Sequence, residues 1–288
     1  MKRSEFRFHE RLRVRWVEVD LQKIVFNGHY LTYFDTAVAG YWRALALPYQ
    51  EAMARLDGDL YVRKATLEYL GSARYDERID VGIRCDRIGQ SSIRLGAAVF
   101  RGETCLVHGE LVYVFADPAT QKSRPVPAPL REAFEAFEAG LPMVQARVGS
   151  WAEQGDAARE IRQQVFADEQ RIPAEILVDE ADASAVHALL INRLGMAVAS
   201  GRLLASAPGV GQIGRMATLA TVRGAGIGRV LLDALVDHAR ARGDQELRLH
   251  AQSTAVSFYE RAGFERSGPD FVEAGIGHVP MRQLLRPA

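Results

Sequence analysis

The segment from Tyr30 to Leu45 constrains the fold of this chain more than any other. Its apolar side chains recur around more than half of a helix circumference. They are Leu31, Tyr33, Phe34, Ala37, Val38, Tyr41, Trp42 and Leu45. A helix with so wide an apolar surface has to be surrounded by other structure. The sequence therefore predicts a helix over residues 30–45 that is buried on most of its sides.

Segments that alternate between apolar and polar residues lie on both sides of this helix in the sequence. In residues 6–16, Phe6, Phe8, Leu12, Val14 and Trp16 share one face, which predicts a strand with one buried side. Residues 81–85, 93–99 and 105–115 alternate in the same way. A short turn with a glycine, Arg101–Thr104, joins the last two and predicts a hairpin. An antiparallel sheet that curls around a helix accounts for all these segments.

The connection between the first strand and the helix carries a motif, Asp20-Leu-Gln-Lys-Ile-Val-Phe-Asn-Gly-His-Tyr-Leu-Thr-Tyr-Phe-Asp. It resembles the signature of the 4-hydroxybenzoyl-CoA thioesterase (YbgC-like) type of acyl-CoA thioesterase, over about residues 5–135. The resemblance implies the hotdog fold, an antiparallel sheet wrapped around a long helix. Its most specific positions are the aspartate, the asparagine seven positions later and the tyrosine three beyond that. Where the family often has glycine three positions after the aspartate, this chain has Lys23.

The same resemblance implies roles for residues of the motif. Thioester hydrolysis needs a group that attacks the carbonyl carbon or activates water, and donors for the developing oxyanion. Asp20 would be that nucleophile or general base, and backbone N–H groups near Asn27 and Gly28 would polarise the carbonyl. His29 is close enough in sequence to share the pocket, although a solvated or capping role is equally open to it. The family's site forms between two subunits, so we expect a homodimer or homotetramer assembled through this domain.

A glycine turn in the second half of the chain joins a strand to a helix. Residues 213–220 form a short apolar run that predicts a buried strand, and apolar residues recur at helical spacing from Val230 to Ala239. Such a turn directs backbone N–H groups toward an anion at the helix N-terminus. It is neither a Walker A loop nor a Rossmann fingerprint, because Arg229 and Val230 stand where those motifs need other residues.

The turn itself, Arg223-Gly-Ala-Gly-Ile-Gly, fits R-x-x-G-x-G and resembles the pyrophosphate loop of the GNAT N-acetyltransferases, which binds coenzyme A. The resemblance implies a cofactor-binding stretch that runs from the strand into the helix. Its residues are Leu219, Thr221, Arg223, Gly224, Gly226, Gly228 and Arg229. A glycine-rich corner without a ligand is the alternative.

A second motif, Ser257–Phe264, resembles the acetyl-CoA motif of the same family in which a tyrosine protonates the departing thiolate. That resemblance makes Tyr259 the implied acid; a tyrosine that merely packs on the sheet is the alternative. Gln164–Gln170 and Phe271–Met281 resemble the ElaA-like branch of GNAT proteins. Within the last segment, Glu273 and His278 are interpreted as surface residues that flank an edge strand.

The general base of an acetyl transfer cannot be named from the sequence. The amine attacks the thioester directly, so the enzyme has only to position it, accept its proton and protonate the sulfur. Glu180 and Asp182 are possible bases, but acidic residues before a strand are more often solvated turn residues.

Two domains are expected in a chain of 288 residues. Residues 140–150 contain glycine and proline and have no periodicity, so we place the boundary there. The predicted fold class is α+β, with a hotdog domain over residues 1–140 and a GNAT α/β domain over residues 150–288. Pro129 is predicted to open a short helix before the boundary, and Asp156 to cap a helix after it.

The charges balance, with 36 Lys and Arg against 36 Asp and Glu, which disfavours a nucleic-acid partner. No apolar run is long enough for a bilayer span, and the N-terminus has no signal-peptide core, so no membrane partner is expected. Cys85 and Cys105 lie far apart in strand-like segments, as is typical of core residues in a reducing compartment. A cytoplasmic location is the resulting expectation, with no metal site and no tightly bound cofactor.

The predicted function is a bifunctional CoA-thioester enzyme. Its substrates would be an acyl-CoA for hydrolysis, and acetyl-CoA with an unknown amine acceptor for acetyl transfer. Two alternatives stay open. The C-terminal domain could be a CoA sensor or scaffold attached to a thioesterase, or both domains could be binding modules of a larger assembly.

Overall fold

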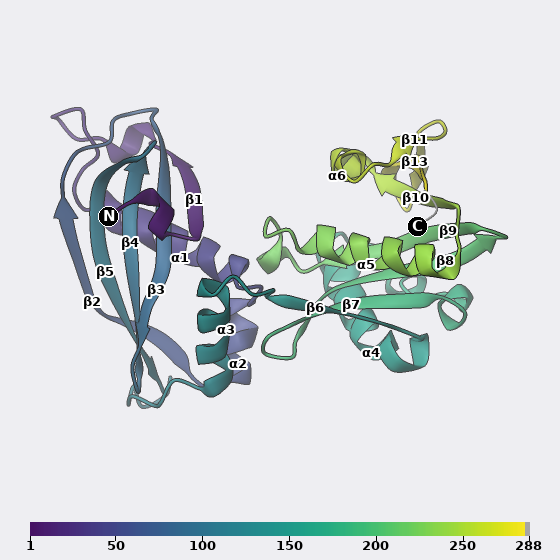
Figure 1. The fold of residues 1–288 in the computed structure, drawn as a ribbon, viewed down its shortest axis with the longest axis horizontal. Helices are drawn as coiled ribbons and strands as arrows, with labels where there is room; N and C mark the ends of the chain where they lie inside the picture. The colour runs from purple at the N-terminus through teal and green to yellow at the C-terminus, as the bar shows by residue number, and fades with distance from the viewer. Residues whose placement is uncertain (286–288) are drawn as a thin grey trace. The chain divides into compact units, whose positions relative to one another are not determined.

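The computed structural model describes residues 1–285, and the chain divides into two compact units, residues 1–143 and the part from Val144 onward (Figure 1). Each unit has its own sheet. Within residues 1–285, no helix is long and apolar enough to cross a membrane.

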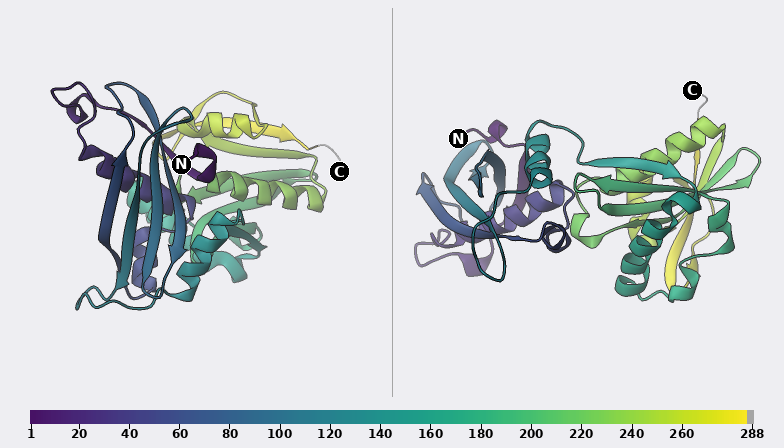
Figure 2. Two further views of the ribbon diagram at one scale, coloured as in Figure 1. Left: turned by 60° about the vertical axis from the view of Figure 1, so that its left-hand side comes forward. Right: turned by 90° about the horizontal axis from the view of Figure 1, so that it is seen from below.

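The first unit is one antiparallel sheet of five strands with the order β1-β3-β4-β5-β2. The strands are β1 (Phe8–Arg13), β2 (Asp59–Tyr69), β3 (Arg78–Ile88), β4 (Ser92–Arg101) and β5 (Thr104–Ala116). The helices are α1 (His29–Ala44), α2 (Tyr49–Arg55) and α3 (Ala128–Glu138). Seen from below, the sheet curls around α1 (Figure 2).

Helix α1 is enclosed because its apolar residues cover most of its surface. Phe34, Ala37 and Tyr41 have no exposed surface, and Tyr33 and Trp42 are also buried. The helix contacts β1, β3 and β4. This arrangement confirms the predicted sheet wrapped around a long helix.

Two details of the first unit differ from the prediction. The first strand ends at Arg13, and Trp16 lies in a short 3-10 turn with 76% of its surface exposed, so its predicted burial was wrong. Strand β2, which lies at one end of the sheet, is not among the predicted strands. Most β2 residues are exposed and do not alternate in burial, so the strand leaves no period-two pattern in the sequence.

The second unit is built on an eight-stranded sheet, in which seven strands follow the order β11-β13-β10-β9-β8-β7-β6 and β12 pairs with β13. The strands are β6 (Val144–Gly149), β7 (Val186–Asn192), β8 (Ala197–Ala207), β9 (Val210–Thr218), β10 (Glu246–Gln252), β11 (Glu265–Arg266), β12 (Phe271–Glu273) and β13 (Ile276–Leu284). All pairs are antiparallel except β9 with β10. The α-helices are α4 (Trp151–Arg162), α5 (Ile227–Arg242) and α6 (Val256–Arg261).

The sheet of the second unit opens between its two parallel strands. The register of β9 with β10 ends at Ile213 and Leu249. Beyond these residues β9 continues to Thr218 and β10 to Gln252 without pairing to each other. Backbone groups along this opening are therefore available to a ligand.

The start of the second unit differs from the prediction. Its first helix begins after Ser150, whose backbone N–H and hydroxyl both donate to the Glu153 carboxylate in a capping box, so the predicted cap at Asp156 was wrong. Residues 144–149 form β6, where the sequence analysis expected an irregular link. This strand is exposed over most of its length and lies at the edge of the sheet, which explains the lack of an apolar pattern. Strand β13, by contrast, is not an edge strand, because it lies between β10 and β11.

Candidate functional sites

The loop before α1 is held in a tight turn around Asp20. The backbone N–H of Asp20 donates to the carbonyl of Ile24, and the carboxylate accepts from the N–H of Gln22 at 2.8 Å. Lys23 has φ of +62°, in the left-handed region. This is the position at which the resembling family often has glycine, so the loop keeps that backbone shape with a lysine, at a cost of about 1–2 kcal/mol.

A buried carboxylate that the sequence analysis missed supports this loop. Glu18 is 2% exposed and accepts hydrogen bonds from the hydroxyl of Tyr33 and the N–H of Arg15, both at 2.7 Å. Burial alone would raise the pKa of Glu18, but these donors and the Arg15 guanidinium hold it below its usual range. The carbonyl of Glu18 also accepts from the N–H of Phe26, which ties the two ends of the loop together.

The start of α1 offers free backbone donors beside the loop. No described residue accepts a hydrogen bond from the N–H of Asn27 or Gly28. Gly28 is the residue before the first helical position, so its N–H has no partner inside the helix. His29 opens the helix, and its ring lies edge-on to Phe26 at 5.9 Å between centroids. The arrangement suits the stabilisation of a developing oxyanion.

Exposed apolar side chains gather in the segments next to this loop. Within the first unit they include Trp16, Val17, Leu21, Phe26, Tyr69, Leu70 and Tyr75. Leu21 is fully exposed, and Trp16 contacts Tyr75 edge-on. A concentration of apolar surface of this kind is typical of a surface that another protein covers.

The glycine turn of the second unit leads into α5 and exposes a run of backbone donors. Gly224 and Gly226 have φ of +88° and +80°, which only glycine adopts without strain. No described residue accepts from the N–H groups of residues 224–228. A Cβ added at Gly226 would meet nothing within 4 Å, so the space in front of the turn is open. Five free N–H groups at a helix N-terminus are suited to binding an anion.

The other predicted loop residues hold the turn in place. Leu219 is buried, and its N–H donates to the carbonyl of Val198. Arg223 donates to both carboxylate oxygens of Glu169 at 2.6 Å and to the carbonyl of Thr218. These contacts fix the strand end and the first residue of the R-x-x-G-x-G sequence. Thr221 lies in the 3-10 turn Ala220–Val222 and is exposed.

The second acetyl-CoA motif lies next to the glycine turn. A Cβ added at Gly228 would lie 3.6 Å from the ring of Phe258, and Arg229 donates to the carbonyl of Arg261. Tyr259 on the same helix is 8% exposed, and burial raises its pKa to about 12. The structure thus brings the two predicted motifs of the second unit together.

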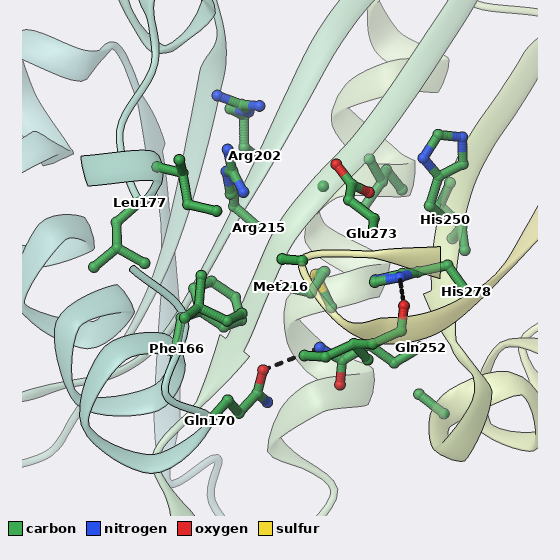
Figure 3. A pocket seen from close by; sticks show the side chains of 18 of the residues that line it. Phe166, Gln170, Leu177, Arg202, Arg215, Met216, His250, Gln252, Glu273 and His278 are labelled. Atoms are coloured by element: carbon green, nitrogen blue, oxygen red, sulfur yellow. Dashed lines mark hydrogen bonds between the residues drawn. The ribbon is translucent and has the colours of Figure 1, made fainter. Parts of the chain in front are cut away.

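A cavity of about 340 Å³ lies where β9 and β10 separate (Figure 3). Tyr259 lines it, together with residues of β8, β9, β10 and the β12–β13 hairpin. Glu273 and His278 also line it. Glu273 is exposed on β12, as predicted for a surface residue, whereas His278 is half-buried, so its interpretation as a surface residue was wrong. Nδ1 of His278 donates to the carbonyl of Ile276 at 2.9 Å, which leaves Nε2 as the ring atom with a lone pair.

Neither predicted candidate for the base is suited to the task. Asp182 is 1% exposed and forms ion pairs of 2.9 Å with Arg162 and Arg202. Although burial raises the pKa of Asp182, these arginines hold it below the usual range, and the carboxylate is not free to accept a proton. Glu180 is exposed, and it is not among the residues that line the cavity. Within residues 1–285, no group of three or more His, Cys, Asp or Glu side chains is placed to bind a metal ion.

Comparisons with known proteins match each unit to a family. Residues 156–285 match the model of the acetyltransferase (GNAT) domain, and residues 22–108 match that of the thioesterase superfamily. An uncharacterized N-acetyltransferase of Bacillus subtilis, YjcF, is 34% identical over 122 residues, which are 42% of this chain and 86% of that protein.

Two solved structures are similar to one half of the chain each. ElaA of Escherichia coli is 25% identical, with a TM-score of 0.45, over 49% of this chain and 99% of its own. A thioesterase of Thermus thermophilus, complexed with coenzyme A and Zn, is 24% identical, with a TM-score of 0.42, over 48% of this chain and 98% of its own. From the family models and the relative, the chain belongs to the GNAT acetyltransferases through its C-terminal half, and its residues 22–108 match a thioesterase-superfamily domain.

Proposed function

We propose that the chain is a bifunctional CoA-thioester enzyme, which hydrolyses acyl-CoA in its first unit and transfers acetyl groups from acetyl-CoA to an amine in its second. One observation in each unit supports the proposal. In the first unit, the N–H groups of Asn27 and Gly28 have no partner and end the loop that carries Asp20. In the second unit, the free N–H groups of the glycine turn reach Gly228, which lies against Phe258, the residue before Tyr259.

For hydrolysis, the Asp20 carboxylate would attack the thioester carbonyl or take a proton from an attacking water. The N–H groups of Asn27 and Gly28 would then stabilise the oxyanion. The exposed apolar side chains around this loop, and the free edge of β2, support a homodimer or homotetramer that covers them. The acyl group would lie in the resulting interface.

For acetyl transfer, the CoA pyrophosphate would bind the N–H groups of residues 224–228. The amine attacks the thioester carbonyl, the new C–N bond forms and the C–S bond breaks. Nε2 of His278 would accept the proton of the amine, and the hydroxyl of Tyr259 would donate a proton to the thiolate. The net proton transfer is from nitrogen to sulfur.

The test is an assay of the full-length protein with a panel of acyl-CoAs, with and without amines. Free acid and N-acetylated amine are measured separately by mass spectrometry. We expect Asp20→Asn to lose hydrolysis and keep acetyl transfer, and Tyr259→Phe to do the reverse. If acetyl-CoA binds but no amine is acetylated, the second unit is a CoA sensor, and the proposed transferase activity is wrong.

A further inference from the structure

The cavity of the second unit has a cationic side. Arg202 and Arg215 line it next to Asp179, and they come from neighbouring strands, β8 and β9 (Figure 3). The pairing of β8 with β9 shifts between Ser200 and Arg202, where β9 has an extra residue. Arg215 lies in this bulge with φ of +52°. A bulge that turns a side chain toward a cavity is a common feature of binding sites.

The cations on this side outnumber the anions. Three arginines share two carboxylates: Arg162 and Arg202 bind Asp182, while Arg202 and Arg215 bind Asp179. Arg202 is 7% exposed, and the Nε atoms of Arg202 and Arg215 are buried without a hydrogen-bond partner. A buried guanidinium that lacks part of its partners favours an additional anion. The cluster is one negative charge short of neutrality.

The other side of the cavity has the opposite character. Figure 3 shows Glu273, His250 and His278 across from the two arginines. No described residue forms an ion pair with the carboxylate of Glu273. His278 stacks on Phe271 at 5.6 Å between ring centroids, and this contact holds the imidazole in place. These groups suit an amine: a carboxylate attracts its charged form, and a neutral imidazole accepts its proton.

We propose that the acceptor is a small zwitterionic amine, an amino acid, whose carboxylate binds Arg215 and whose amino group faces Glu273 and His278. This inference rests on the proposed acetyl transfer and names the substrate class of that site. The cavity of about 340 Å³ is at the lower end of small-molecule sites, which suits one amino acid. A polyamine has no anion for Arg215, and the amino terminus of a peptide carries no carboxylate at that distance.

The test compares each of the proteinogenic l-amino acids with its own carboxamide, with full-length protein and acetyl-CoA. The two compounds differ only in the anion, and spermidine is added as an amine without one. N-acetylated product is measured by mass spectrometry, so thioester hydrolysis does not interfere. We expect at least one amino acid to exceed its carboxamide by about 10- to 100-fold in kcat/KM, the usual range for a hydrogen bond to a charged group.

Variants of Arg215 assign this preference to one side chain. Arg215→Gln should lower kcat/KM for the amino acid to the level of its carboxamide and leave the carboxamide unchanged. Arg215→Lys, which keeps the charge, should restore part of the preference. Arg248→Gln is the matched control, because Arg248 lies in the same sheet, is 57% exposed and pairs with Glu246 outside the cavity. The proposal would be overturned if the parent protein acetylated each amino acid and its carboxamide at equal rates. It would also be overturned if Arg215→Gln lowered kcat/KM for both compounds to the same extent.

Calorimetry separates this inference from the proposed reaction. The same amino acids are titrated into protein saturated with CoA, in which no transfer can occur. If amino acids bind in an Arg215-dependent way but are never acetylated, the second unit binds amino acids as proposed, and the proposed acetyltransferase activity is wrong. Acetylation of spermidine alone would keep the transferase and refute the amino acid. No binding and no acetylation of any amino acid would refute the acceptor class outright.

Discussion

The guanidinium group of Arg223 donates two hydrogen bonds of 2.6 Å to the two carboxylate oxygens of Glu169. Arg223 is the first residue of the glycine turn, and Glu169 ends the π-helical segment Gln163–Glu169 after α4. The pair is bidentate, which is the strong geometry for an arginine and a carboxylate. With its charge already matched, Arg223 positions the turn, and we infer that the backbone N–H groups provide the pyrophosphate contacts.

A double-mutant cycle tests this role of the pair. If Arg223 positions the turn, Arg223→Gln and Glu169→Gln should weaken acetyl-CoA binding to a similar extent, by about 2- to 5-fold, because each breaks the same partly exposed pair. The double variant should lose little more than either single one. Calorimetry with acetyl-CoA provides the affinities. Tighter binding by Glu169→Gln, together with a large loss in Arg223→Gln, would mean instead that Arg223 binds the pyrophosphate directly.

The regular parts of the fold could be predicted because their burial follows one period. The helix predicted over residues 30–45 is α1, His29–Ala44, and the predicted turn Arg101–Thr104 joins β4 to β5. Strands β2 and β6 could not be found, since both lie at sheet ends, where few residues are buried. A pattern of apolar residues reports burial, and an exposed strand is held by backbone hydrogen bonds that any sequence can form.

Some of the candidate site residues could be predicted from the sequence, and others could not. Short local motifs identified Asp20, the glycine turn and Tyr259, because each lies in one continuous segment. The cavity of the second unit could not be predicted, since Arg202, Arg215 and His278 come from three strands that meet only in the folded sheet. For Asp182 the sequence allowed a role that the structure excludes. In the sequence it is an acidic residue that could be the base, but in the fold it is paired with Arg162 and Arg202.

Replacement of Asp20 separates catalysis from folding in the first unit. Asp20→Asn keeps the shape and can still accept the hydrogen bond from Gln22, so the protein should stay folded. It removes the charge and the basicity, and acyl-CoA hydrolysis should fall by at least about 100-fold. The control is Asp86→Asn, an exposed aspartate on β3. Release of free CoA is measured for both, and unchanged hydrolysis in Asp20→Asn would refute the assigned role.

Glu18 should contribute a pH-dependent part of the stability of the first unit. Its pKa is lower in the folded protein than in the unfolded chain, so its stabilising effect is complete above about pH 4.3. The effect is lost as the pH falls from there through the folded pKa. Glu18→Gln should cost about 1–3 kcal/mol at pH 7, because the donors from Arg15 and Tyr33 lose a charged acceptor.

Urea unfolding at pH 7 and at pH 3.5 measures this contribution. The difference in stability between the parent protein and Glu18→Gln should be smaller at pH 3.5 than at pH 7. Glu132→Gln, an exposed glutamate on α3, serves as the control and should behave as the parent protein. A difference that does not change with pH would mean that the glutamate acts through packing rather than through its charge.

Gly226→Asp should abolish acetyl-CoA binding by the second unit. The new carboxylate would stand in the open space before the free N–H groups and repel the pyrophosphate. Gly243→Asp is a close control, since Gly243 ends the same helix with φ of +91° and also has nothing within 4 Å of an added Cβ. Both changes strain the backbone alike. Calorimetry should show near-normal affinity for acetyl-CoA in Gly243→Asp and no binding in Gly226→Asp. If the two variants bind acetyl-CoA equally well, the turn does not bind the pyrophosphate.

The last prediction concerns Tyr259, which distinguishes an acetyltransferase from a CoA sensor. Burial raises the pKa of its hydroxyl to about 12, so the side chain stays protonated, and able to donate, throughout the neutral and mildly alkaline range. Tyr259→Phe keeps the ring and its contacts with Phe258 and Phe264, so acetyl-CoA affinity should change little. Acetyl transfer should fall by about 100-fold, the lower end for general-acid catalysis, because an aliphatic thiolate is already a fair leaving group. If Tyr259→Phe transfers acetyl groups at the full rate, water or another residue protonates the sulfur. If neither the parent protein nor Tyr259→Phe acetylates any amine although both bind acetyl-CoA, the second unit only senses the coenzyme.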